Sequence, residues 1–300
     1  MTTLKPSRPA ASLVPPHRAK PARRSEFKVL SAFAHVALAV WAIIVLGPIL
    51  WTFLSAFKDT EEIFSSPWTL PGHLRWENFG RAWTTAHVGQ YMLNSVIVVS
   101  LSTIGTMLLG SMAAYVLARY KFWGNRLIYF LFVSGLAFPV FLAIVPLFFV
   151  VKNLHLLNTH TGLILVYIAY SLPFTVFFLS AFFRTLPNTV AEAALIDGAG
   201  HVRLFFQVMM PMARSGLISI TIFNVIGQWA QYQLPVVLLS SAKDKWVITQ
   251  GIADIAVNAG FQADWSGLFA ALTLAILPMI AVYALLQRQI QAGLTSGAVK

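Results

Sequence analysis

Three carboxamide side chains share one face of the helix that the sequence predicts over residues 216–240. Asn224, Gln228 and Gln231 fall at i, i+4 and i+7, and Tyr232 follows directly. Side chains at these intervals lie on one side of an α-helix. Amides and phenols donate and accept hydrogen bonds, so this face has the chemistry to bind the hydroxyl groups of a solute along a translocation path. Polar groups in apolar segments also join helices to one another, and the residues alone favour neither interpretation.

Nothing in the sequence indicates catalysis or metal binding. The 300-residue chain has no cysteine, and of its seven histidines only His155 and His160 lie near one another in a loop. These two histidines lack further ligands at the spacing of a metal site. A glycine-rich phosphate loop ending in Lys and Ser or Thr is absent, so the chain is not expected to hydrolyse ATP. We expect no catalytic residue, no metal ion and no bound cofactor.

A second group of polar residues lies in the segment 186–211, between two apolar segments. Thr189 and Glu192 fit a capping box, in which Thr189 begins a helix and the Glu192 side chain reaches back to it. Gly198 is expected to end that helix in the left-handed conformation. Asp197 is expected to accept backbone N–H groups across the turn. The segment therefore predicts a hairpin of two short helices.

The second helix of this hairpin is expected over about 201–210, with Pro211 at its end. Four apolar residues have helical spacing in it: Val202, Phe205, Phe206 and Met209. Small residues around the turn would let another backbone approach closely: Ala193, Ala194, Gly198, Ala199 and Gly200. Docking onto a partner protein and packing within the chain are equally good interpretations of these residues.

The composition indicates an integral membrane protein. Hydrophobic residues make up 58% of the chain and charged residues only 10%, whereas soluble domains carry about 25% charged residues. Mean hydropathy is +0.73. Six segments without Asp, Glu, Lys or Arg each exceed the ~20 residues that cross a bilayer as a helix. They are residues 30–54, 92–118, 127–151, 161–183, 216–240 and 266–287. The fourth segment holds secondary candidates for the path, namely Tyr167, Tyr170 and Ser171.

The charge distribution predicts which side of the membrane each loop faces. Six spans place both termini on one side, and 15 of the 21 Lys and Arg residues then lie on that side. Cytoplasmic loops carry the excess of positive charge. We therefore expect cytoplasmic termini and the external loops 55–91, 152–160 and 241–265. The net charge of +11 is then expected to contact anionic membrane lipid rather than nucleic acid.

The chain is expected to have one folded domain and a tail. Residues 1–28 hold five prolines and seven Lys or Arg residues without apolar periodicity, which predicts a disordered basic cytoplasmic tail. A six-helix transmembrane domain is expected over residues 29–300, with the hairpin between its fourth and fifth helices and a cytoplasmic C-terminal tail over 288–300. Aromatic residues of the first external loop are expected at the membrane interface, on a short amphipathic helix: Trp68, Trp76 and Trp83.

The hairpin carries a motif that resembles the cytoplasmic signature of the permease subunits of ABC importers. That signature reads Glu-Ala-Ala, three residues, Gly, nine residues and then Ile-x-Leu-Pro. This chain has Glu192-Ala193-Ala194, Gly198 and then Val208-Met209-Met210-Pro211 at the same spacing. The resemblance implies that the hairpin is a coupling helix, with Glu192 as a charged contact to an ATPase and Gly198 as the turn.

Further matches over residues 30–300 narrow the resemblance to carbohydrate permeases of the maltose-type, MalG-like group. They include Ser55-Ala56-Phe57-Lys58, Trp76-Glu77-Asn78-Phe79, Ile144-Val145-Pro146-Leu147 and the C-terminal stretch 293–300. The chain departs from the group at Trp229-Ala230-Gln231, where the family often has Trp-Asn and an acid.

The resemblance implies a fold, a function and partners. The fold would be the all-α type I ABC importer permease fold with six transmembrane helices, and the location the bacterial inner membrane. The chain would be the permease subunit of an ATP-driven, binding-protein-dependent importer of sugars or oligosaccharides. Its partners would be a second homologous permease, an ATPase dimer that binds ATP and Mg²⁺, and a periplasmic or extracellular solute-binding protein.

Other functions fit the sequence less well. An acidic saccharide such as an oligouronate, or a glycerol phosphate, could be carried by the same machinery. A secondary transporter usually has ionisable residues within the membrane or inverted repeats, and the sequence shows neither. A membrane enzyme would need clustered His, Asp or Glu. An ABC permease for amino acids or phosphate would lack the long first external loop and the C-terminal ending.

Overall fold

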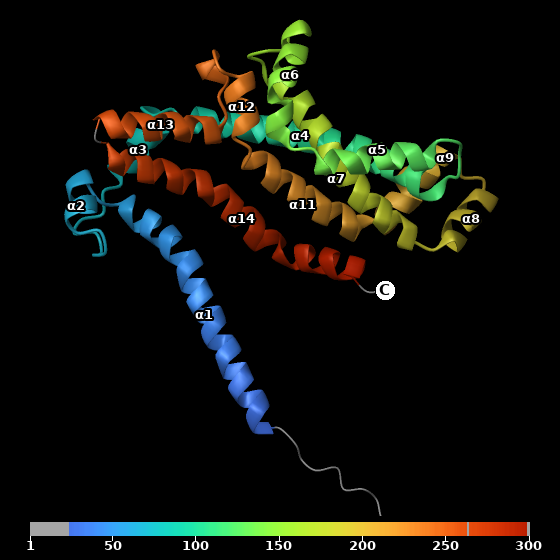
Figure 1. Ribbon diagram of the computed structural model, residues 1–300, viewed down its shortest axis with the longest axis horizontal. Helices are drawn as coiled ribbons and strands as arrows, with labels where there is room; N and C mark the ends of the chain where they lie inside the picture. The colour runs from blue at the N-terminus through green and yellow to red at the C-terminus, as the bar shows by residue number, and fades with distance from the viewer. Residues whose placement is uncertain (1–23, 263, 299–300) are drawn as a thin grey trace, which may run out of the picture. The chain divides into compact units, whose positions relative to one another are not determined.

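The computed structural model describes residues 24–262 and 264–298, and every regular element in this part of the chain is a helix (Figure 1). The long helices are α1 (Arg24–Ser55), α4 (Val88–Arg119), α7 (His160–Thr185) and α14 (Trp265–Ala298). Helices of intermediate length are α5 (Asn125–Ala137), α6 (Val140–Asn153), α11 (Arg214–Trp229) and α13 (Ile248–Gln262). The short ones are α2 (Thr60–Ser65), α3 (Glu77–Thr84), α8 (Asn188–Ile196), α9 (His201–Arg203), η1 (Leu204–Met209), α10 (Met210–Met212), α12 (Gln233–Leu238) and η2 (Lys243–Lys245).

The chain divides into two compact units, Met1–Leu50 and Trp51–Lys300. In the described residues of the first unit, α1 is an uninterrupted apolar helix that continues into the second unit as far as Ser55. The expected disordered tail lies outside the described residues up to position 23. Its last five residues belong to α1, because that helix begins at Arg24.

Four helices are long and apolar enough to cross a membrane, and two bent helix pairs would raise the number to six. The four are α1, α4, α7 and α14. One pair is α5 with α6, and the other joins His201–Met212 to α11. The chain is therefore a multi-pass membrane protein by length and composition, and its helical class agrees with the sequence.

The predicted span 127–151 is wrong as a single helix. It is divided at Phe138 and Pro139 into α5 and α6, which are bent by 109°. Proline has no N–H to donate and drives the preceding residue to extended backbone, and Phe138 has a ψ of 117°. The chain therefore turns through more than a right angle at this point.

The predicted span 216–240 is also wrong, because α11 ends at Trp229 and α12 is a separate short helix. Pro235 lies in the first turn of α12, where its missing N–H is not needed. A continuous helix would leave the Gln231 carbonyl without that N–H. Thr249 Oγ1 donates to this carbonyl instead, at 2.8 Å.

Two opposite ends of the second unit are built differently (Figure 1). One end holds α8 and α9, which belong to the hairpin. The other holds α2, α3 and α13. Residues 241–265 were predicted to form a loop, but α13 occupies most of this segment, with Ile248 and Ala259 buried on one face. A short amphipathic helix, α3, is present between residues 55 and 91 as predicted, and it buries Asn78 and Ala82. Of the three tryptophans only Trp83 lies within it, with Trp76 at its N-cap and Trp68 outside it.

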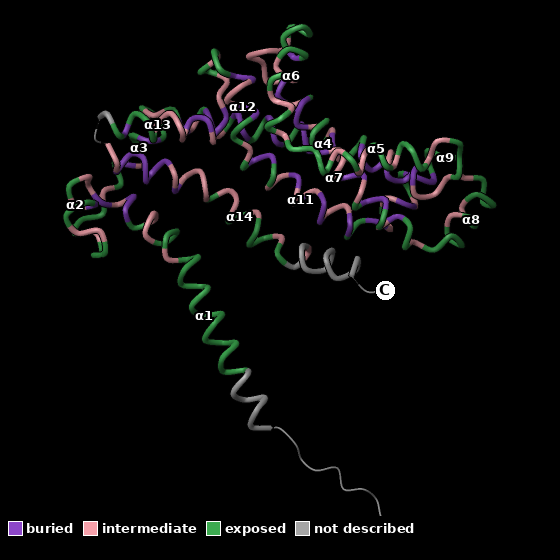
Figure 2. The backbone as a smooth tube through the Cα atoms, viewed as in Figure 1, coloured by how far each residue is buried: buried purple, intermediate pink, exposed green. Residues whose placement is uncertain are grey.

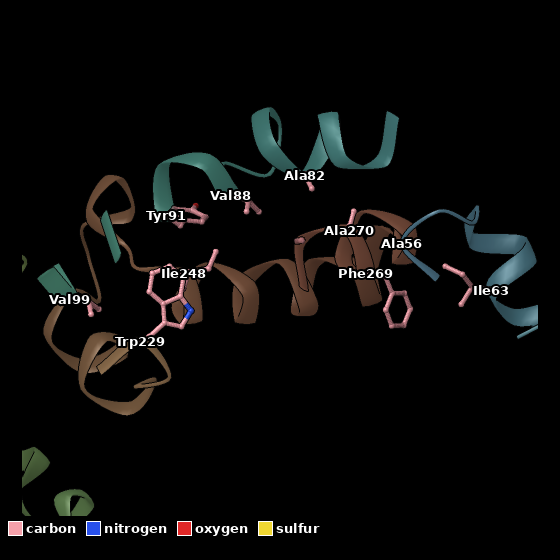
Figure 3. Packing of buried hydrophobic residues seen from close by; sticks show 11 residues of the cluster. Ala56, Ile63, Ala82, Val88, Tyr91, Val99, Trp229, Ile248, Phe269 and Ala270 are labelled. Atoms are coloured by element: carbon pink, nitrogen blue, oxygen red, sulfur yellow. The ribbon is translucent and has the colours of Figure 1, made fainter. Parts of the chain in front are cut away.

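The core follows α4, α7 and α11, where buried residues concentrate (Figure 2). One cluster joins the start of α4 to α13 and α14 and includes Tyr91, Ile248 and Phe269 (Figure 3). A second cluster lies at the start of α7 and includes Leu163, Tyr167 and Leu238. The third cluster, called the hairpin core below, attaches the hairpin to the ends of α4 and α7.

Candidate functional site

The first helix of the hairpin, α8, begins without the predicted capping box. Pro187 is its N-cap and no side chain caps it, so Thr189 lies within the helix. Leu186, the residue before the proline, has a ψ of 142°, as expected for a residue that precedes proline. The proline therefore fixes where α8 starts, and Glu192 has no capping role.

Gly198 ends α8 as the sequence predicts, with a φ of +80°. The N–H of Ala199 donates to the Ala194 carbonyl at 2.9 Å, and the N–H of Gly198 donates to the Leu195 carbonyl at 3.1 Å. This pair of bonds is a Schellman motif. The expected bonds to the Asp197 carboxylate do not occur among the described residues, because the left-handed glycine already closes the turn through the backbone.

The second limb of the hairpin is mostly a π-helix. It begins after Gly200, and η1 buries Leu204, Phe205 and Met209, while Val202 and Phe206 are exposed. Phe205 and Met209 are therefore buried as predicted, whereas Leu204 takes the place of Val202 and Phe206 on the buried face. Leu204 and Met209 are five residues apart, the spacing of the hydrogen bonds in a π-helix. Pro211 lies in the following helical turn, α10, rather than at the end of the helix.

The two faces of α8 have different surroundings. Ala191 and Ala194 pack against the hairpin core. Glu192, Ala193, Leu195 and Ile196 are exposed, and Ile196 is 86% exposed. Glu192 has no ion pair or hydrogen bond within the described part of the chain. Of the small residues around the turn, Ala194 packs within the chain, whereas Ala193, Gly198 and Gly200 are exposed, so a charged and apolar face stays open.

Arg119, at the end of α4, fixes the start of the hairpin. Its guanidinium donates to the carbonyls of Leu186 and Pro187 at 3.0 and 3.2 Å. It also donates to Asn188 Oδ1 at 2.6 Å. These partners lie 67 to 69 positions away from Arg119 in the sequence. Nothing local in the sequence signals such a contact.

Asn224, Gln228 and Gln231 line one cavity of about 340 Å³ between α5, α7 and α11. The secondary candidates Tyr167, Tyr170 and Ser171 also line it. Tyr232 lines a different, largely apolar pocket beside α13 and α14. The structure therefore brings three of the four predicted path residues together.

Two of these amides also join helices. Gln228 Oε1 accepts hydrogen bonds from Ser102 and Thr103 of α4 at 2.6 and 3.1 Å, and its Nε2 donates to Ser171 of α7 at 3.0 Å. Asn224 Nδ2 donates to Thr175 Oγ1 of α7 at 2.9 Å. Both amides thus link α11 to neighbouring helices while they line the cavity.

A charged cluster lies at the opposite end of the unit from the hairpin. Arg75 pairs with Asp59 at 2.9 Å, and Arg81 pairs with Asp264 at 3.3 Å. The backbone N–H of Glu62 holds the pKa of Asp59 below its ordinary value, and the Arg75 guanidinium adds to this effect. These pairs tie the segments around α2, α3 and α14 together.

Lys58 is fully buried beside that cluster and has no carboxylate partner among the described residues. Its ammonium donates to the Ser66 carbonyl at 2.8 Å, where α2 ends. Carbonyl groups at the end of a helix favour a cation, so Lys58 organises the segment around α2.

Comparison with known proteins decides the family. The model for binding-protein-dependent transport system inner membrane components matches residues 106–296. The chain belongs to this family. The diacetylchitobiose uptake system permease protein NgcG of Streptomyces coelicolor is 52% identical over 93% of this permease and 92% of its own length. The expectation of an ABC importer permease is thereby confirmed.

More distant relatives agree with this family. The sn-glycerol-3-phosphate transport system permease protein UgpE of Yersinia enterocolitica is 31% identical over 88% of this permease and 96% of its own length. A solved bacterial ABC transporter involved in import of the acidic polysaccharide alginate has a chain that superposes with a TM-score of 0.78. That match covers 89% of this permease and 99% of the other chain at 20% identity, so it shows a shared fold.

Proposed function

We propose that this permease is a subunit of an ATP-driven, binding-protein-dependent importer that carries sugars or oligosaccharides across the bacterial cytoplasmic membrane. Its membership of the inner membrane component family supports the importer class. The observation that carries the sugar assignment is 52% identity to a diacetylchitobiose uptake permease over nearly the whole chain. An N-acetylated disaccharide is therefore the first solute to test.

The hairpin would couple this permease to an ATPase. Its exposed face carries Glu192 beside Leu195 and Ile196, and exposed apolar residues rimmed by charge favour a protein interface. Arg119 and the hairpin core attach the hairpin to α4 and α7. Movement of the hairpin on closure of an ATPase dimer would then be carried to the helices that line the cavity.

The remaining partners follow from the same proposal. A second homologous permease would complete the translocation path, because the cavity of this chain is only partly enclosed in the isolated subunit. A solute-binding protein would deliver sugar at the end of the molecule that holds α2, α3 and α13. ATP and Mg²⁺ would bind the ATPase subunits, and this chain would bind no cofactor.

Charge reversal at Glu192 tests the proposal. Cells lacking the native gene would express Glu192→Lys, and uptake of labelled diacetylchitobiose would be measured. Glu192 is exposed and has no partner among the described residues, so the variant is expected to insert normally and to lose uptake. Glu61→Lys reverses an exposed acid outside the hairpin and should retain uptake.

Two results would contradict the proposal in different ways. Normal uptake by Glu192→Lys would remove the coupling role of the hairpin. Failure of the wild-type complex to import any neutral saccharide would remove the sugar assignment, while the fold and family would stand.

A further inference from the structure

We propose that the cavity between α5, α7 and α11 is a binding site for one uncharged sugar ring, and that it excludes anionic solutes. The inference rests on the proposed importer function and adds to it the chemical class of solute and the residues that recognise it. The related proteins named above carry different solutes by name, including sn-glycerol 3-phosphate. The cavity therefore has to account for a choice among them.

Two interruptions of regular helix border the cavity. Leu136 and Phe138 line it where α5 gives way to α6, and Gln231 lines it just after α11 ends. Non-helical backbone at membrane depth is tolerated where it lines a cavity or is buried in protein. Broken helices of this kind frame solute sites in other membrane transporters. The position of the two interruptions thus favours a site for a polar solute here.

Three polar groups of the cavity keep hydrogen-bonding capacity. Tyr167 is only 2% exposed, yet its hydroxyl has no hydrogen-bond partner within residues 24–262 and 264–298. Asn224 uses its Nδ2 on Thr175 and Met107, which leaves Oδ1 free as an acceptor. Gln231 accepts from the Gln233 N–H through Oε1, which leaves Nε2 free as a donor. Buried polar groups are normally paired, so a solute with both donors and acceptors fits these three.

Aromatic rings supply the apolar part of the site. Phe174 of α7 and Phe223 of α11 both line the cavity, with ring centroids 6.1 Å apart. Phe138 and Tyr170 line it as well. Small-molecule sites combine an apolar and aromatic lining with a few placed polar groups, in volumes of about 300–1,000 Å³. A sugar ring presents C–H groups to such a lining and hydroxyl or acetamido groups to the amides.

Charge is what the cavity lacks. None of the described residues that line it is Asp, Glu, Lys, Arg or His. A carboxylate or phosphate placed there would lose its hydration without gaining a counter-ion, and this is costly in a low-dielectric site. The lining therefore selects a neutral saccharide over a uronate or a glycerol phosphate.

Gly227 allows the cavity to be filled without disturbing the fold. It lines the cavity, it lies within α11, and a Cβ built on it meets no atom within 4 Å. Gly227→Leu is expected to occupy the space of the sugar ring, with Gly227→Ala as a milder step. Gly260→Leu is the matched control, because Gly260 is a helical glycine of α13 that also faces open space.

The experiment uses the complete importer reconstituted in lipid nanodiscs without the solute-binding protein. Equilibrium dialysis would measure binding of labelled diacetylchitobiose and, separately, of digalacturonate. We expect the wild-type complex to bind the neutral disaccharide and not the anionic one. Gly227→Leu should weaken neutral binding by roughly tenfold or more, while Gly260→Leu leaves it unchanged.

A charge introduced at the rim tests the selectivity separately. Gln231→Lys should weaken binding of the neutral disaccharide and create binding of digalacturonate. The site is overturned if Gly227→Leu binds diacetylchitobiose as the wild type does, and the exclusion of anions is overturned if the wild type binds both disaccharides equally. In either case, uptake by the wild type in cells would still support the importer function, so the two proposals fail independently.

Discussion

Gly198 and Gly200 stand two residues apart in the hairpin and differ in backbone conformation. A Cβ at either position meets no atom within 4 Å. Gly198 has a φ of +80°, whereas Gly200 has a φ of −70° and a ψ of 163°, which any residue adopts. Substitution at the pair therefore separates the need for a left-handed turn from the need for space.

Gly198→Ala should impair the hairpin and Gly200→Ala should not. A left-handed residue with a Cβ costs about 1–2 kcal/mol, and this cost falls on the Schellman turn that closes α8. We expect faster proteolysis of the hairpin and reduced sugar uptake for Gly198→Ala at normal membrane levels. Equal behaviour of the two variants would show that the turn conformation is unimportant.

Arg119 provides a second prediction for a single residue. Arg119→Ala removes the donors to the Leu186 and Pro187 carbonyls and to Asn188. We expect the reconstituted complex to hydrolyse ATP but to import sugar several-fold more slowly, because the hairpin would move without carrying α4. Arg119→Lys should rescue only in part, since an ammonium lacks the planar fork of a guanidinium.

The control for Arg119 lies nearby. Arg126 is at the start of α5, its guanidinium lies over the Phe130 ring at 5.6 Å, and no hydrogen bond from it occurs in the described residues. In Arg126→Ala the ratio of sugar uptake to ATP hydrolysis should equal that of the wild type. Matching losses in both variants would point to a general effect of positive charge.

At the scale of elements, short sequence patterns predicted some features correctly and others wrongly. The stop at Gly198 and the amphipathic α3 follow from a few adjacent residues, and the structure confirms both. The capping box failed because Pro187, and Arg119 from another helix, set the start of α8. Hydropathy placed the apolar segments but could not reveal the 109° bend between α5 and α6, since both sides of the bend are apolar.

Two further elements were missed for identifiable reasons. The apolar positions Ile248, Ile252, Ile255 and Ala259 have helical spacing and signal α13, but polar residues between them lower the hydropathy of the segment. The π-helix η1 buries Leu204, which the α-helical spacing of the hairpin did not predict. Of the predicted path, Tyr232 lines a different pocket, although its neighbour Gln231 lines the cavity.

The segment around α2 and α3 is expected to respond to acid. Asp59 precedes α2 and Arg75 precedes α3, so their ion pair ties these elements together. The pKa of Asp59 is lower in the folded state than in the unfolded state. The stability that its ion pair contributes is therefore fully present above the unfolded pKa and is lost as the pH falls through the folded pKa. Hydrogen exchange in residues 59–76 should rise below about pH 4. Asp59→Asn should show raised exchange already at neutral pH and a weaker dependence on acid, and an unchanged acid profile would contradict this account.

At the scale of the whole second unit, the hairpin, the charged cluster and the uncharged cavity occupy different regions. The hairpin lies at one end and the charged cluster around Arg75 and Arg81 at the other (Figure 1). The uncharged cavity lies among α5, α7 and α11, along the helices that join those ends. This arrangement agrees with the proposed importer, in which the solute-binding protein, the cavity and the ATPase follow one another along the same helices.

The attachment of the hairpin also limits how such permeases can be recombined. Tyr115 of α4 packs against Phe183 and Phe205, and Arg119 holds the residues that lead into α8. A graft of residues 186–211 alone would leave these partners mismatched in the recipient. The exchangeable unit is the hairpin together with the last turns of α4 and α7. Chimaeric importers that pair a new motor with an old path, and natural recombination between permease genes, would have to cross over outside that unit.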